Sequence, residues 1–169
     1  GAIAGIGRHC PIKMPHKAPY AAPHKTLGRA DGWQGARLMP LMKIAIPENK
    51  KFMHQCSIPI RWGDMDAVGH VNNTNYIRYL EIARTEWMMQ MRADSGEGYP
   101  AKTGPVIVNV FCNFYLPMKF PGNVIAKLYV SDCGRSTFDT WVTMELEGQE
   151  GTIYAAGGAT VIWIDMEKE

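Results

Sequence analysis

Residues 61–84 read RWGDMDAVGHVNNTNYIRYLEIAR, and this stretch decides the fold. Two carboxylates, two glycines, a histidine and two asparagines stand directly before a segment whose apolar residues recur at the period of an α-helix. These apolar residues are Tyr76, Leu80, Ala83, Trp87 and Met91. Because no Gly or Pro interrupts residues 74–94, we predict a helix of roughly 18 residues that begins near position 73.

The start of this helix is a place where negative charge is favoured. Asn72, Asn73 or Thr74 can cap it, because each carries a short side-chain acceptor for a free N–H group. The first turn of a helix leaves backbone N–H groups without partners, and the helix dipole places partial positive charge there. A developing oxyanion at this point would therefore be stabilised.

The loop before the helix carries two acids that could supply chemistry. Gly63 and Gly69 allow sharp turns and close approach of a ligand. Asp64 and Asp66 are two positions apart, so one can act as nucleophile or general base while the other binds backbone or solvent. The alternative interpretation is that Asp beside Gly before a helix forms only a turn and a cap.

A metal site is a second alternative for the same stretch. Asp64, Asp66 and His70, with His54 upstream, could act as ligands. Carboxylates mixed with one or two histidines suit several metals, and no second cluster of ligands follows downstream. We therefore expect no metal at this loop.

The remaining segments alternate in the manner of β-strands. Strands are predicted at residues 53–61, 106–116, 124–130, 138–146 and 152–165, with a hairpin connection at 147–151. Gly157-Gly158 predicts a bulge or the close approach of another backbone. Short connections favour antiparallel neighbours, so the four strands after the helix are predicted to form a meander. The fold class is α+β, with one dominant helix covering one face of a curved sheet of about five strands.

Composition divides the chain into a leader and one domain. Residues 1–51 hold nine Lys or Arg, only two acids, and six of the 11 prolines. Residues 52–169 also hold nine Lys or Arg, but they hold 14 acids. We predict that residues 1–51 are disordered or derive from an overextended reading frame, and that residues 52–169 form one domain. The leader lacks interleaved aromatic residues, so no nucleic-acid partner is expected.

Cysteine usage and hydropathy suggest where the protein resides. Cys10, Cys56, Cys112 and Cys133 form no Cys-x-x-Cys pair and no metal-ligand spacing, which favours free thiols in a reducing cytoplasm. No apolar run approaches the length needed to span a bilayer. A cytoplasmic location without membrane contact is expected.

The order of residues in the loop and helix start resembles the signature of hotdog-fold acyl-CoA thioesterases. The pattern Asp-x-Asp-x-x-Gly-His-Val-Asn-Asn-x-x-Tyr, followed by Glu-x-x-Arg, occupies residues 64–76 and 81–84. The closest group is the 4-hydroxybenzoyl-CoA thioesterase-like family, and the resemblance covers about residues 52–165. It implies a hotdog fold and the hydrolysis of an acyl-CoA, or acyl-carrier, thioester to a free acid and a thiol.

The resemblance also implies roles for individual residues. It makes Asp66 the catalytic carboxylate, and it assigns the backbone N–H of Asn73 to polarising the thioester carbonyl. His70 would position Asp66 or the substrate. Substrate-binding residues would be Gly69, Asn72, Tyr76, Lys119, Arg135 and Ser136, and the candidate lining of an acyl tunnel is Trp62, Met65, Val68, Tyr76 and Phe111.

Hotdog relatives place their sites at a subunit boundary, so the resemblance implies a homodimer or a dimer of dimers. Hydrolysis of this kind requires no cofactor and no metal. Two other functions remain open: a hotdog protein that binds acyl-CoA without catalysis, and a hotdog dehydratase or hydratase. Dehydratases use a His with a differently placed acid, and no second motif of that kind occurs in the chain.

Overall fold

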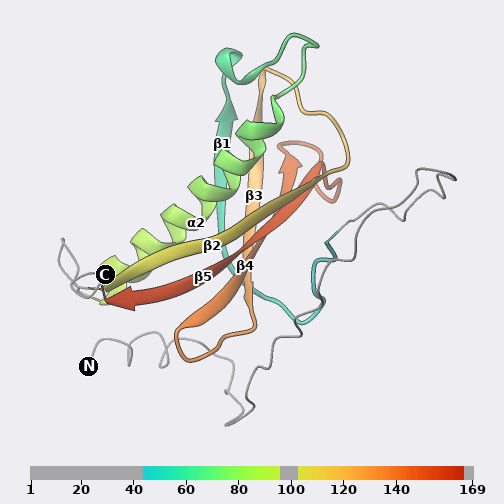
Figure 1. Cartoon of the computed structure of the whole chain (residues 1–169). Helices are drawn as coiled ribbons and strands as arrows, with labels where there is room; N and C mark the ends of the chain where they lie inside the picture. The colour runs from blue at the N-terminus through green and yellow to red at the C-terminus, as the bar shows by residue number, and fades with distance from the viewer. Residues whose placement is uncertain (1–43, 96–102, 166–169) are drawn as a thin grey trace, which may run out of the picture.

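The computed structural model describes residues 44–95 and 103–165. Its elements, in chain order, are β1 (Lys51–Ile60), a 3-10 helix η1 (Trp62–Asp64), α2 (Asn73–Ser95), β2 (Thr103–Phe114), β3 (Gly122–Ser131), β4 (Thr137–Leu146) and β5 (Ala155–Asp165). One long helix thus packs on a five-stranded antiparallel sheet, as Figure 1 shows. The α+β prediction is confirmed.

The strands are ordered β1-β3-β4-β5-β2, and every neighbouring pair is antiparallel. The predicted four-strand meander is correct for β3, β4 and β5 but wrong for β2, which pairs with β5 at an edge of the sheet. Three strand spacings separate β2 from β3, or about 14 Å. Seven connecting residues, 115–121, can span up to about 23 Å. A short connection therefore does not force two strands to pair.

The helix buries its predicted stripe against the sheet. Tyr76, Leu80, Ala83 and Trp87 are all less than 8% exposed. They meet an inner sheet surface of fully buried side chains, among them Leu128, Val142, Met144 and Val161. This single apolar layer forms the core of the domain.

Gly157 lies where the helix and a neighbouring strand both come close to β5. A Cβ added there would lie 2.3 Å from the backbone oxygen of Phe111 and 2.7 Å from Cδ1 of Leu80. Gly158 is similarly crowded by the backbone oxygen of Thr140. The predicted close approach is confirmed, whereas the irregularities in strand register lie in β1 and β2 instead.

Residues 44–50 lie across the sheet face that points away from the helix. The side-chain amide of Asn113 in β2 donates a 2.9 Å hydrogen bond to the carbonyl of Ile44. Toward the opposite edge of the sheet, the Lys50 ammonium lies 5.2 Å from the ring centre of Tyr129 in β3. This part of the predicted leader therefore contacts the domain, and residues 1–43 lie outside the described residues.

Candidate functional site

Asp64 ties the loop after β1 to the first turns of α2. Its Oδ2 accepts hydrogen bonds from the Arg61 N–H and from the Tyr79 hydroxyl, both at 2.8 Å. Its backbone carbonyl accepts from the Asn72 N–H and from the Asn75 side-chain amide, both at 2.9 Å. This acid thus holds both the loop and the helix start in place.

Tyr79 is the buried partner in this arrangement. Its side chain is 2% exposed. Burial raises the pKa of the Tyr79 hydroxyl well above its ordinary value, and the bond to Asp64 and the charge of that carboxylate raise it further. The hydroxyl therefore keeps its proton and remains the donor to Asp64.

Asp66 lies at the beginning of a tight turn that fixes its side chain. Its Oδ1 accepts from the N–H groups of Val68 and His70, at 2.9 and 3.3 Å. Its own N–H donates to the His70 carbonyl at 2.8 Å. Gly69 has φ +76°, a conformation that favours glycine and lets the turn close. Within residues 44–95 and 103–165, Oδ2 of Asp66 has no hydrogen-bond partner.

His70 acts on Asp66 through its main chain. Both its N–H and its carbonyl bond to that residue, and its imidazole makes no hydrogen bond within the described part of the chain. The structure therefore gives a positioning contact between His70 and Asp66, and the role of the imidazole stays a prediction.

The helix start leaves one backbone N–H available. Asn72 is the cap, because its Oδ1 accepts from the N–H and the hydroxyl of Thr74 at 2.9 and 2.8 Å. Its carbonyl accepts from the Asn75 N–H. The Asn73 N–H, between them, has no acceptor among the residues that the structure describes. An oxyanion can bind at this point without displacing a protein group.

Tyr76 belongs to the core and fastens the helix start to the β2–β3 connection. It is 4% exposed, its hydroxyl oxygen accepts from the Met118 N–H at 3.1 Å, and its ring packs edge-on against Phe114. Burial is the main cause of a raised pKa for its hydroxyl, and the nearby Asp66 charge adds to it. Any contact of Tyr76 with substrate would be made from this buried position.

The predicted nucleotide contacts fall at opposite ends of the sheet. Lys119 follows Met118, whose carbonyl accepts from the Val71 N–H, so it lies at the same end as the Asp66 loop. Arg135 and Ser136 follow β3, which begins beside the end of β1 and runs away from that loop. Since β3 is 10 residues long, Arg135 and Ser136 lie about 30 Å from the Asp66 loop. The structure therefore does not bring Arg135 and Ser136 together with Asp66 in one chain.

The up-and-down alternation of the elements could have revealed this separation. The Asp66 loop follows β1, α2 runs from that loop to the opposite end of the sheet, and β2 runs back to the Asp66 end. β3 then runs away from it again, so the β3–β4 connection must lie at the opposite end. The bond between Asp64 and Tyr79 had no such signal. It joins residues 15 positions apart through a side-chain contact that no local pattern encodes.

Apolar side chains beside Asp66 are exposed in the single chain. Trp62 and Val68 are 79% and 75% exposed, although they were predicted to line an acyl tunnel. The interface between helix and sheet is filled by core side chains instead. A cleft of about 300 Å³ lies on the outer face of the sheet, beside Phe111 and Trp141. It contains none of the predicted catalytic residues.

The four residues considered as one metal site are divided by the fold. His54 lies within 4.8 Å of ligand atoms of Cys56 and Glu86 rather than with Asp64, Asp66 and His70. Cys56 and Cys112 are free thiols, and Cys10 lies outside the described residues. Among the described residues, no helix combines the length and apolarity needed to cross a membrane.

Comparisons with known proteins agree on one family. The family model of the thioesterase-like superfamily matches residues 60–169. A proposed thioesterase from Pseudomonas aeruginosa is 33% identical, with 70% of this chain and 89% of that chain covered and a TM-score of 0.64. A proposed acyl-CoA thioesterase from Xanthomonas campestris is 34% identical, with 68% and 95% covered and a TM-score of 0.61. The DHNA-CoA thioesterase of Staphylococcus aureus, 19% identical with 68% and 75% covered and a TM-score of 0.58, shares the fold.

Proposed function

The chain belongs to the thioesterase-like superfamily, and from this membership we propose how its residues hydrolyse an acyl-CoA thioester. The fold is the hotdog fold, and the enzyme class is thioester hydrolase. One observation carries the assignment of residues: Asp66 presents an unbonded Oδ2 in the loop that leads directly to the free Asn73 N–H.

The oxyanion site is the start of α2. The thioester carbonyl oxygen would accept a hydrogen bond from the Asn73 N–H, and the helix dipole would stabilise the charge that develops on it. Asn72 caps the helix with its side chain and thereby keeps that N–H in a fixed direction. The backbone, rather than the Asn73 side chain, performs this step.

Asp66 supplies the carboxylate. Its Oδ2 either attacks the carbonyl carbon, with water then hydrolysing the resulting anhydride, or removes a proton from a water that attacks. In both routes the carbon–sulfur bond breaks, the CoA thiolate leaves and takes a proton, and a free acid remains. The two bonds from the Val68 and His70 N–H groups hold the carboxylate in place for this step.

We further propose that two copies of the chain assemble into a homodimer, with a dimer of dimers as the larger form. β2 is an edge strand, and Val106, Val108, Val110 and Phe114 on it are 39–56% exposed. Exposed apolar edges of this kind are usually covered. If the two β2 strands pair antiparallel, the two-fold axis is perpendicular to the strands and exchanges the ends of the sheet. The partner subunit's Arg135 would then lie at the Asp66 end of the first copy, where it could meet the CoA phosphates.

The test is thiol release from a panel of aliphatic and aromatic acyl-CoAs. Asp66→Asn is expected to lower kcat by about 10²- to 10⁴-fold, the usual contribution of a catalytic acid or base. Asp94→Asn makes the same chemical change at an exposed position near the end of α2 and should leave turnover unchanged. Turnover of Asp66→Asn within about twofold of wild type would remove Asp66 from the reaction. An acyl-CoA that binds to wild type without thiol release would indicate a binding protein.

A further inference from the structure

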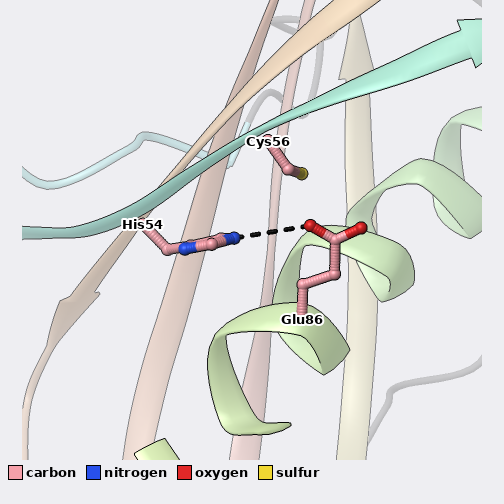
Figure 2. Close-up of side chains that lie close together, drawn as sticks. All are labelled: His54, Cys56 and Glu86. Atoms are coloured by element: carbon pink, nitrogen blue, oxygen red, sulfur yellow. Dashed lines mark hydrogen bonds and ion pairs between the residues drawn. The ribbon is translucent and has the colours of Figure 1, made fainter. Parts of the chain in front are cut away.

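Three side chains with metal-binding atoms converge between β1 and α2, away from the Asp66 loop. His54 and Cys56 are two positions apart on β1, so both point to the same face of the strand. Glu86 reaches toward them from α2, as Figure 2 shows. The imidazole, thiol and carboxylate atoms all lie within 4.8 Å of one another.

The spacing of His54 and Glu86, which form a long hydrogen bond and ion pair, also suits two ligands of one ion. The His54 Nε2 and Glu86 Oε2 atoms are 3.5 Å apart, longer than the usual 2.7–3.2 Å of an N–H···O bond. Two nitrogen or oxygen ligands of a tetrahedral zinc ion, each at about 2.0–2.2 Å, are separated by about 3.4 Å. The separation of these two atoms is therefore close to that of two ligands of one zinc ion.

We propose that His54, Cys56 and Glu86 bind one zinc ion. Thiolate, imidazole and carboxylate together are ligands that suit Zn²⁺, whereas Mg²⁺ and Ca²⁺ prefer oxygen ligands alone. Three protein ligands leave a fourth position for water. The side chains of His54 and Glu86 are 25% and 50% exposed, which gives the ion a path from solvent.

Cys56 is the inner ligand of this site. It is 9% exposed and lies beside the Glu86 carboxylate. Burial, with the charge and hydrogen bonding of Glu86, raises the pKa of the thiol to about 12 in the absence of an ion. A bound metal deprotonates a coordinating thiol, so binding releases a proton.

The site is separate from the hydrolytic one. Glu86 follows Asn73 by 13 residues, or about 20 Å along the helix axis. Its ligands join β1, an edge strand, to the second half of α2. Because the ion would bind the folded state and bridge these two elements, its effect is to stabilise the fold.

The test uses the full chain, reduced and stripped of metal by a chelator. Zn²⁺ is titrated against a competing chromophoric chelator, and Co²⁺ is added as a spectroscopic probe. We expect one ion per chain, a thiolate-to-cobalt charge-transfer band, and a higher Tm with Zn²⁺. Glu86→Gln should weaken Zn²⁺ binding at least tenfold, and Cys56→Ala should remove the charge-transfer band.

Glu86→Gln changes an exposed side chain, so a loss of binding in that variant cannot be attributed to failure to fold. Cys10→Ser is the matched control, because His9 and Cys10 also offer an imidazole and a thiol. It should retain the ion, the band and the rise in Tm. The proposal is overturned if wild type binds no Zn²⁺ tighter than the competing chelator, if Glu86→Gln binds as wild type does, or if Cys10→Ser alone abolishes binding.

Discussion

The bond between the Tyr79 hydroxyl and the Asp64 carboxylate should measurably stabilise both the loop and the helix. Tyr79→Phe keeps the buried ring and removes only the hydroxyl. The Asp64 Oδ2 retains its 2.8 Å bond from the Arg61 N–H and is partly open to water. A hydrogen bond to a charged group contributes about 1.5–3 kcal/mol. We therefore expect Tyr79→Phe to lower the free energy of unfolding by about 1.5–2 kcal/mol.

Asp64→Ala should cost more, because it leaves donors without an acceptor. Tyr79 is 2% exposed, so its hydroxyl would be left buried without its partner, and the Arg61 N–H, at an exposed position, would also lose its acceptor. A buried unsatisfied group costs about 1–3 kcal/mol, so the expected loss is about 2–4 kcal/mol. Once Asp64 is gone, Tyr79→Phe removes a hydroxyl that has become unfavourable. The loss of unfolding free energy in the double variant should therefore be smaller than the sum of the two single losses, by about 1 kcal/mol or more.

Urea unfolding of the four proteins, followed by circular dichroism, measures these differences as shifts in the midpoint at constant m. Tyr154→Phe is the matched control, because its hydroxyl bonds to Gln149 at an exposed position. It should change the free energy by less than about 0.5 kcal/mol. If the losses from the two single substitutions add within about 0.5 kcal/mol, the two side chains are not coupled and the reasoning fails. The reasoning would also fail if Tyr79→Phe changed the free energy of unfolding by no more than Tyr154→Phe does.

Gly157→Ala should destabilise the fold by about 3 kcal/mol, since its new methyl group would meet backbone and Leu80, whereas Gly63→Ala, with open space around it, should not. Equal urea midpoints for the two variants would contradict this. Burial of Glu145 opposes its ionisation, yet hydrogen bonds from Lys127 and a backbone N–H outweigh this and hold its pKa below 4.5. The ionised Glu145 side chain therefore stabilises the fold fully at pH values above 4.5, and this stabilisation is lost as the pH falls through the pKa that Glu145 has in the folded state. In Glu145→Gln this acid-dependent loss should be smaller than in wild type, and equal pH profiles of thermal unfolding would refute the assignment.

Periodicity predicted the elements of this fold because each apolar stripe is a local property. The helix stripe from Tyr76 to Trp87 and all five predicted strands are found in the structure, but burial alternates clearly only in β1, β3 and the first half of β4. The middle of β2 is exposed on both faces, and the first half of β5 is buried on both. The partner of β2 could not be predicted in the same way. Strand pairing depends on where the helix leaves room on the sheet, and a seven-residue connection permits more than one neighbour.

The candidate site shows the same division between local and distant information. The positions of Asp66 and Asn73 relative to the helix start follow from the sequence, because both lie within a few residues of it. The tie from Asp64 to Tyr79 and the meeting of His54 with Glu86 depend on tertiary contacts between side chains 15 and 32 positions apart. No local pattern contains them.

The strand order also has a consequence for how the chain reaches its folded state. Ser131 pairs with Asp139 across a short hairpin, 8 positions apart, whereas the β2–β5 pair that is closest in sequence, Phe114 with Ala155, is 41 positions apart. Closing the longer loop costs more entropy before any contact compensates for it. We therefore expect the β3–β4–β5 hairpins to form in the folding transition state and β2 to join afterwards. Substitutions in β3 and β4 should then slow folding, whereas substitutions in β2 should mainly speed unfolding.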